Sequence, residues 1–89
     1  MEKEFLKPYW EDGEIRTFDV CRDDEEYVWH RDHEDREIEV LKGQGWQFQI
    51  KGCLPWLLEK GMVFNIKKDE MHRLIRGANN LELRIVKNA

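Results

Sequence analysis

Apolar and polar side chains alternate with a period of two along most of this 89-residue chain, and this alternation constrains its fold more than any other feature. The clearest run is 46–50, where Trp46, Phe48 and Ile50 are separated by glutamines. Successive side chains of a strand point to opposite faces, so such a run predicts a strand with one buried face. No segment carries a helical apolar stripe longer than two turns. We therefore expect an all-β protein.

Short runs of this kind recur at even spacing, which is typical of a β-sandwich or barrel. We expect Val28, His30 and Asp32 to share one face of their strand, and the acidic run 23–26 to form a solvated turn. About seven or eight strands are predicted, at 15–20, 27–32, 36–41, 46–50, 56–58, 62–66, 71–76 and 81–86.

The size of the chain leaves room for one domain, residues 1–89, with a modest core. Four Trp, four Phe and two Tyr must supply most of that core, because aromatic side chains bury the largest areas. Four Trp exceed what so small a core can enclose. We therefore predict a homodimer whose interface includes at least one of Trp10, Trp29 and Trp56.

Charge and composition exclude several classes of function. Residues 1–44 hold 15 acids and 7 bases (net −8), and residues 45–89 hold 4 acids and 8 bases (net +4), which argues against a general nucleic-acid binder. No apolar stretch approaches the length of a membrane span, and residues 1–4 lead into no apolar signal region, so a cytoplasmic protein is expected. Cys21 and Cys53 are expected to be free thiols packed as small hydrophobic residues. The absence of Ser excludes a serine nucleophile.

From about residue 28 to residue 86 the chain resembles the cupin family of small double-stranded β-helix barrels. His30-Arg31-Asp32, then Arg36, then Gly43 stand where the family's first motif has His-x-His, Glu and Gly. Gly61 and His72 stand at the two ends of the second motif. The segment 29–36 also looks like small cupin-like proteins of tailed bacteriophages. The resemblance implies a cupin-like antiparallel β-barrel.

The resemblance also implies a metal site, with two departures from the family pattern. Asp32 replaces the second His, and Arg36 replaces the Glu. His30, Asp32 and His72 would form a 2-His-1-carboxylate site for a divalent metal such as iron, nickel, zinc or manganese. A guanidinium in place of the Glu would repel a cation and attract an anion.

Each of these residues also has a structural interpretation. His30 and His72 can be ordinary strand histidines, Asp32 can be a salt-bridge partner, and His33 is expected to face outward. Arg36 either binds a small anionic ligand or braces an ion-pair network with Asp32 and Asp35. Trp46 is a second candidate for contact with the ligand, although a place in the core is the more usual role for such a residue.

The sequence therefore predicts a small cupin-type protein that binds a divalent metal at His30, Asp32 and His72 and a small, anionic ligand at Arg36 and Trp46. It leaves the reaction open among oxygenation, isomerisation and hydrolysis, since fold does not decide chemistry. The alternative is a metal-free cupin-like interaction module, in which the same residues form a buried polar network. Such a module could be a phage accessory protein acting on a host partner.

Overall fold

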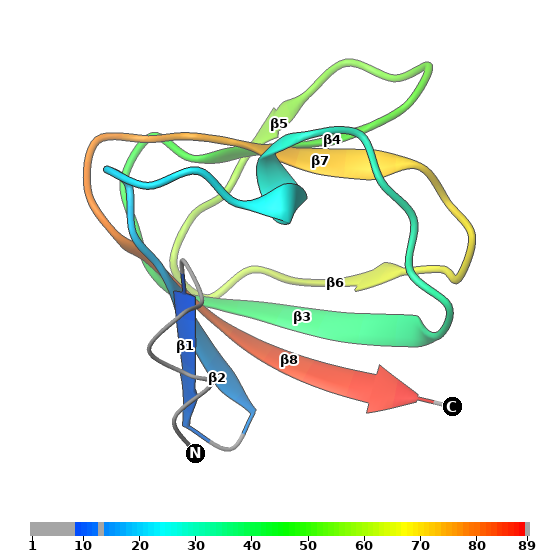
Figure 1. Cartoon of the computed structure of the whole chain (residues 1–89), viewed down its shortest axis with the longest axis horizontal. Coiled ribbons are helices and arrows are strands. Elements are labelled where there is room, and N and C mark those ends of the chain that lie inside the picture. Colours follow the sequence, from blue (N-terminus) through cyan, green and yellow to red (C-terminus); the bar gives the residue numbers. More distant parts are fainter. Residues whose placement is uncertain (1–8, 13, 89) are drawn as a thin grey trace.

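The structure of this chain is a computed structural model that describes residues 9–12 and 14–88. The described residues form eight strands and one 3₁₀ turn, η2 (Glu25–Tyr27) (Figure 1). This composition confirms the prediction of an all-β protein. The strands are β1 (Tyr9–Asp12), β2 (Ile15–Phe18), β3 (Asp35–Lys42), β4 (Gln47–Ile50), β5 (Trp56–Leu57), β6 (Val63–Ile66), β7 (His72–Ile75) and β8 (Leu81–Asn88).

The strands pair antiparallel in two sheets that face each other across a shared interior (Figure 1). One sheet has the order β1-β2-β8-β3-β6 and the other the order β5-β4-β7. The chain passes to the opposite sheet between β3 and β4, between β5 and β6, and at both ends of β7. This alternation between two sheets is that of a double-sheet jelly roll. The predicted small antiparallel barrel is confirmed.

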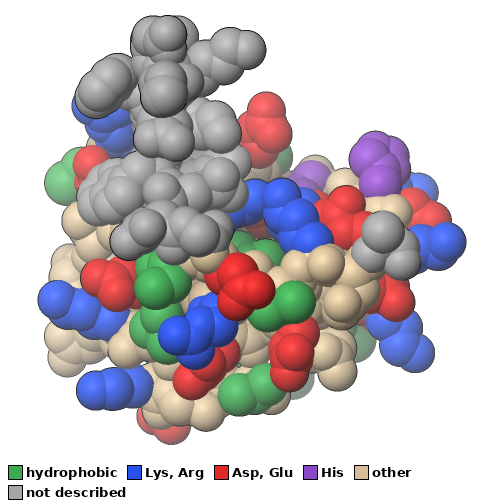
Figure 2. All heavy atoms as spheres, turned by 90° about the horizontal axis from the view of Figure 1, so that it is seen from below, with side chains coloured by type: hydrophobic (Ala, Val, Ile, Leu, Met, Phe, Trp, Pro, Cys, Tyr) green, Lys and Arg blue, Asp and Glu red, His purple; other side chains and the backbone are tan. Residues whose placement is uncertain are grey.

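The core lies between the two sheets and follows the period-two pattern of the sequence. In β3, Ile38 and Val40 are buried while Glu37 and Glu39 point outward, as expected for a strand with one buried face. The outer face of the larger sheet mixes apolar with acidic and basic side chains (Figure 2). The buried cluster consists of Phe18, Ile38, Val40, Trp46, Phe48, Leu58, Ile66, Leu74, Leu81, Leu83 and Ile85.

Trp46 is the largest fully buried side chain, and the backbone closes tightly around it. Its indole Nε1 donates a hydrogen bond to the carbonyl of Asn79 over 2.6 Å. A Cβ on Gly77 would lie 2.2 Å from the Gln44 carbonyl oxygen and 2.4 Å from the indole, so only glycine fits there. Trp46 is 0% exposed and its polar atom is engaged. The expected contact between Trp46 and a ligand is therefore corrected to a place in the core.

The segment predicted as a strand at 27–32 has a different structure. Asp24 caps η2, because its carboxylate accepts a hydrogen bond from the Glu26 amide over 2.8 Å. This capped turn displaces the strand, and only one isolated bridge remains, between His30 and His72. Val28 is 60% exposed and Asp32 only 6%, so the prediction that they share a face is wrong.

The remaining strands lie within a few residues of their predicted positions, and β1 was not predicted. β1 forms a hairpin with β2, with Tyr9 opposite Phe18 and Asp12 opposite Ile15. The side chain of Trp10, one of the predicted interface residues, lies outside the described part of the chain. In the described ranges, no helix has the length and apolar character needed to cross a bilayer.

Both cysteines are free, as predicted, but neither is packed in the interior. Cys21 and Cys53 are both exposed. Each lies in a turn, Cys21 after β2 and Cys53 between β4 and β5, so the core does not enclose it. The expectation of buried thiols is therefore wrong.

Candidate metal centre

The structure brings His30, Asp32 and His72 together at one end of the barrel. His72 Nε2 lies 3.3 Å from Asp32 Oδ2, and His30 Nε2 lies 3.9 Å from Asp32 Oδ1. The two imidazole rings meet edge to face, with centroids 4.3 Å apart. His72 is 1% exposed and Asp32 6%. The three residues that the sequence singled out as metal ligands are therefore neighbours in space.

The single bridge between His30 and His72 produces this convergence. Each residue donates its amide hydrogen to the other's carbonyl, over 3.1 Å and 2.9 Å. Residues directly opposite in an antiparallel pair project their side chains to the same face. The bridge therefore places both rings on one face although the residues are far apart in the sequence.

Hydrogen bonds to the backbone determine which nitrogen of each ring is available. His30 Nδ1 lies 2.8 Å from the Val28 carbonyl oxygen, and His72 Nδ1 lies 2.7 Å from that of Glu70. A carbonyl oxygen only accepts, so each Nδ1 carries the proton. In the neutral ring, Nε2 then presents a lone pair to the cluster. This tautomer and this backbone contact are typical of histidines that ligate metals.

Glu26 belongs to the same cluster, which the sequence did not predict. Its Oε1 lies 2.8 Å from His30 Nε2. Ligand atoms of Glu26, His30 and His72 all lie within 4.8 Å of one another. The available signal was an acid four residues before a candidate ligand, a spacing that places two side chains on one side of a helical turn. We interpreted that acid as part of a solvated turn instead.

Arg36 lies beside the cluster and contacts three carboxylates. Its Nε donates to Glu34 Oε2 over 2.7 Å, and its two terminal nitrogens lie 3.4 Å from Asp32 Oδ1 and 3.9 Å from Glu26 Oε2. Asp35 is not part of this network, because its carboxylate accepts the Lys68 amide. The bracing role of Arg36 is therefore present in the structure, with Glu34 and Glu26 in the place expected for Asp35.

Three polar atoms in the cluster are buried and have no hydrogen-bond partner among the described residues: His30 Nε2, Asp32 Oδ2 and His72 Nε2. Two of these atoms nevertheless lie close to an acceptor: His30 Nε2 is 2.8 Å from Glu26 Oε1, and His72 Nε2 is 3.3 Å from Asp32 Oδ2. A protonated ring would donate across these contacts. Buried polar atoms without partners are costly, and a set of them calls for an explanation. A cation accepted by all three atoms would supply it.

The charges of the cluster also favour a bound cation. Glu26, Asp32 and Glu34 contribute three negative charges against the one positive charge of Arg36, which leaves two uncompensated when both histidines are neutral. The atoms of Glu26, His30 and His72 are slightly too far apart for an ion as they stand, and Asp32 lies outside that group of three and must move towards it. Two ligands each about 2.1–2.2 Å from one ion are at most about 4.4 Å apart, so the 4.8 Å spread must contract by less than an ångström.

Protonation of His30 partly relieves the same excess of negative charge. Burial lowers the pKa of this imidazole, but the Glu26 carboxylate more than offsets burial, and the pKa of His30 is raised to about 8. Burial raises the pKa of the Asp32 carboxyl, since it disfavours the charged form. His72 and Arg36 favour the ionised form more strongly, so the pKa of Asp32 lies below its usual value. The cluster therefore favours an ionised Asp32 and a positive charge close to His30.

The barrel interior next to the cluster is nearly filled. Glu26 and Arg36 border a cavity of about 20 Å³ whose other walls are apolar, among them Phe48 and Phe64. A space of this size accommodates about one water molecule. This space is too small for the carboxylate or phosphate ligand that the sequence analysis expected at Arg36.

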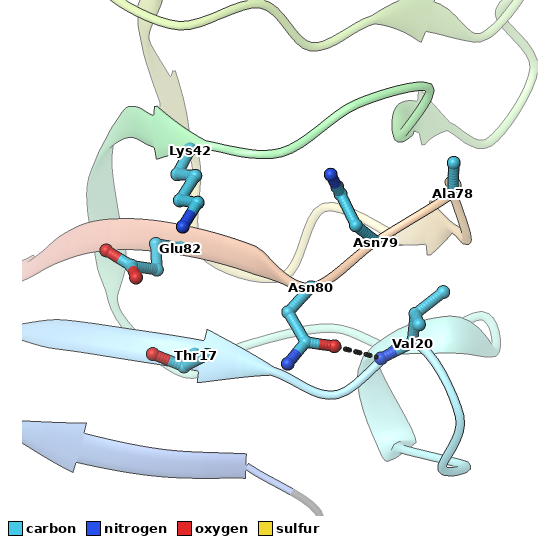
Figure 3. A pocket seen from close by; sticks show the side chains of 7 residues that line it. All are labelled: Thr17, Val20, Lys42, Ala78, Asn79, Asn80 and Glu82. Atoms are coloured by element: carbon cyan, nitrogen blue, oxygen red, sulfur yellow. Dashed lines mark hydrogen bonds between the residues drawn. The ribbon is translucent and has the colours of Figure 1, made fainter.

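A larger hollow of about 550 Å³ opens elsewhere, between β2, the start of β8 and the turn before β8 (Figure 3). The Asn80 side chain there accepts the Val20 amide over 2.9 Å. None of the residues of the metal cluster lines this hollow. It contains no histidine or cysteine, so it lacks the donors that the sequence predicted for a metal.

His33 was expected to face outward, and it is exposed. The histidine side chains visible in Figure 2 lie at one margin of the molecular face shown there, among acidic and basic side chains. His33 has no contact with the cluster in the described structure. It therefore offers a matched control for experiments on His30 and His72.

The fold and the cluster together define a small jelly-roll barrel with a histidine–carboxylate centre at one end. No protein-family model matches the chain, and a search of curated proteins finds no match. Among solved structures, the chain is similar to protein NMB1881 from Neisseria meningitidis, with a TM-score of 0.62 and 16% sequence identity over 91% of this chain and 80% of that one. At this identity the similarity supports the fold alone.

Proposed function

We propose that this chain is a small cupin-type protein that binds one divalent metal ion through His30, His72, Asp32 and Glu26. The observation that carries the proposal is the convergence of three buried atoms without partners, with both histidines held in the tautomer that presents Nε2. Two imidazoles and two carboxylates suit zinc, iron(II), nickel or manganese. The cupin resemblance also assigns His30 and His72 to ligand positions, which is in keeping with this proposal.

The small anionic ligand expected from the sequence is not part of this proposal. Arg36, which was expected to bind it, already contacts three carboxylates. The adjacent cavity of about 20 Å³ leaves no space for an organic acid. The sequence-based expectations of a cytoplasmic location and a homodimer are kept as part of the proposal, the first supported by the two free thiols.

The test is metal analysis and calorimetry on protein purified without a histidine tag. We expect one equivalent of a divalent ion, and binding at least tenfold weaker in His30→Ala, since each 1.4 kcal/mol is about a factor of ten. His33→Ala is the matched control, because His33 is exposed and close in sequence. Absence of saturable binding, or equal losses in the two variants, would refute the proposal.

The metal-free interaction module is the second candidate, and the contact between Glu26 and His30 favours it. A protonated His30 beside Glu26 supplies a positive charge to the cluster without any metal. In that protein Arg36 is a charge-compensating residue that also excludes cations. Arg36→Glu distinguishes the two, because metal binding by the variant but not by the parent protein would identify the parent as the metal-free module.

A further inference from the structure

The segment 21–34, which we call the mouth segment, is joined to the barrel by few backbone hydrogen bonds. It occupies the place of the strand beside β7, but in the described structure it shares only the His30–His72 bridge with that strand. One further backbone bond joins it to the loop after β6, from the Asp69 amide to the Asp32 carbonyl over 2.8 Å. By comparison, β8 pairs along its length with β3. The mouth segment therefore lacks the ladder that holds the other strands.

The mouth segment and the two residues after it carry an excess of acidic side chains. From residue 21 to residue 36 the chain has seven acids and three bases (7 − 3 gives a net charge of −4 with neutral histidines). Asp24, which caps η2, is buried, and its Oδ2 accepts no hydrogen bond from the described residues. Arg76 pairs with Asp23, and Arg36 contacts three of the other acids. A positive ion within this segment would relieve the repulsion that remains.

The candidate ligands belong to separate pieces of structure. Glu26 lies in η2, His30 lies in the bridge, and His72 lies in β7. Asp32 adds a fourth donor, since its Oδ1 faces Arg36 and its Oδ2 lies 3.3 Å from His72 Nε2. An ion held by all four would join the two ends of the mouth segment to β7.

The cluster is also closed to larger molecules. The side chains of His30 and Glu26 are each 18% exposed, and His72 and Asp32 are nearly inaccessible. The interior beside them holds about 20 Å³. Four protein ligands with no adjoining space are typical of structural metal sites, whereas catalytic sites keep a position open to substrate.

Resting on the proposed function, we infer that the metal ion is a structural cross-link that fastens the mouth segment to β7. It stabilises the segment where the strand ladder is missing, and all of its ligands come from the protein. Removal of the ion frees the mouth segment and leaves the two paired sheets intact.

Limited trypsin digestion with and without Zn²⁺ tests this inference. Arg22 and Arg31 are exposed cleavage sites within the mouth segment, and Lys60, exposed in the turn before β6, is an internal reference. We expect Zn²⁺ to slow cleavage after Arg22 and Arg31 at least tenfold relative to cleavage after Lys60. Amide hydrogen exchange at His30, whose N–H bonds to the His72 carbonyl, should slow in parallel.

A matched pair of variants on η2 makes the test specific. Glu26→Gln removes one proposed ligand, whereas Glu25→Gln makes the same change at an exposed neighbour. We expect Glu26→Gln to lose most of the protection by Zn²⁺ and Glu25→Gln to keep it. Equal protection in both variants would overturn the inference.

Two further outcomes separate this inference from the proposed function. If calorimetry shows Zn²⁺ bound at His30 and the mouth segment gains no protection, the cross-link is refuted while metal binding stands. If no Zn²⁺ binds, both fail.

A separate experiment tests whether the site is closed. With Co²⁺ in the site, azide should leave the visible spectrum unchanged, because a closed site offers no exchangeable position. A spectral change would refute closure.

Discussion

Replacement of Arg36 by Ala is expected to destabilise the metal-free protein and to strengthen its binding of divalent metal. Arg36 is held within 2.7–3.9 Å of Glu34, Asp32 and Glu26, and its side chain is only 12% exposed. Without it, the 6% exposed Asp32 carboxylate has, among the described residues, no cationic side chain within ion-pair distance other than the histidines. The three acids then repel one another without compensation.

The expected loss of unfolding free energy in Arg36→Ala lies between two known limits. Breaking a buried ion pair costs about 3–5 kcal/mol, and exposed pairs contribute about 0–1 kcal/mol. The partial burial of Arg36 places the loss at about 2–3 kcal/mol. For a domain of this size, 1 kcal/mol corresponds to roughly 4–8 °C, so the melting temperature should fall by roughly 10–20 °C. The same change removes a repulsive charge near the ion, and metal affinity should rise about tenfold or more.

Urea unfolding at pH 7, with and without Zn²⁺, measures the first effect, and calorimetry measures the second. Arg84→Ala is the matched control, because Arg84 pairs with Glu39 on the surface and should cost less than about 1 kcal/mol. Arg36→Lys keeps the charge and should leave metal affinity close to that of the parent protein. If Arg36→Ala is as stable as the parent, or binds metal more weakly, the electrostatic reasoning is wrong.

Three further predictions concern other features of the molecule. The pKa of His30 is about 8 in the folded protein and 6.5 in the unfolded chain. Protonated His30 therefore stabilises the fold by about 2 kcal/mol below pH 6.5, and this stabilisation is lost as the pH rises through 8. Chemical unfolding of the metal-free protein across this range should show the decline in unfolding free energy, and a flat profile would contradict it. Gly77→Ala should destabilise the fold by more than about 2 kcal/mol, since the new methyl collides with the Gln44 carbonyl and with Trp46; a normal melting curve would show that the turn can move. Light scattering should give a dimer, weakened by Trp29→Ala, because Trp29 is 36% exposed; a monomer at micromolar concentration would refute the dimer.

The period-two alternation was sufficient to predict most of the strands. Ile38 and Val40 in β3 and Phe48 in β4 are buried as their spacing indicated. Local chemistry overrode the pattern at 27–32, where Asp24 caps η2. There the hydrogen bond from a nearby side chain was more favourable than a strand whose ladder would have had one neighbour. β1 has no comparable alternation and was not predicted, whereas β2 falls within the strand predicted at 15–20.

The candidate site was predicted in part. His30, Asp32 and His72 were named as ligands from their spacing and the family resemblance, and the structure places them together. Glu26 was missed because an acidic run before a strand is usually solvated. Trp46 was named as a ligand contact, but it is 0% exposed. The amphipathic pattern of 46–50 predicts which face of the strand is buried, but not how completely each side chain on that face is enclosed.

The sequence by itself determined the fold class and the local pattern, because the alternation of side chains along a strand is a property of neighbouring residues. It also determined the chemistry available, since two histidines with nearby carboxylates suit few purposes. Only the tertiary structure decided which of these groups meet. The bridge from His30 to His72, the three acids around Arg36 and the closure of the cavity all depend on how two sheets pack together. Contacts between residues far apart in the chain are determined by packing of the whole core, and this packing cannot be predicted from local periodicity.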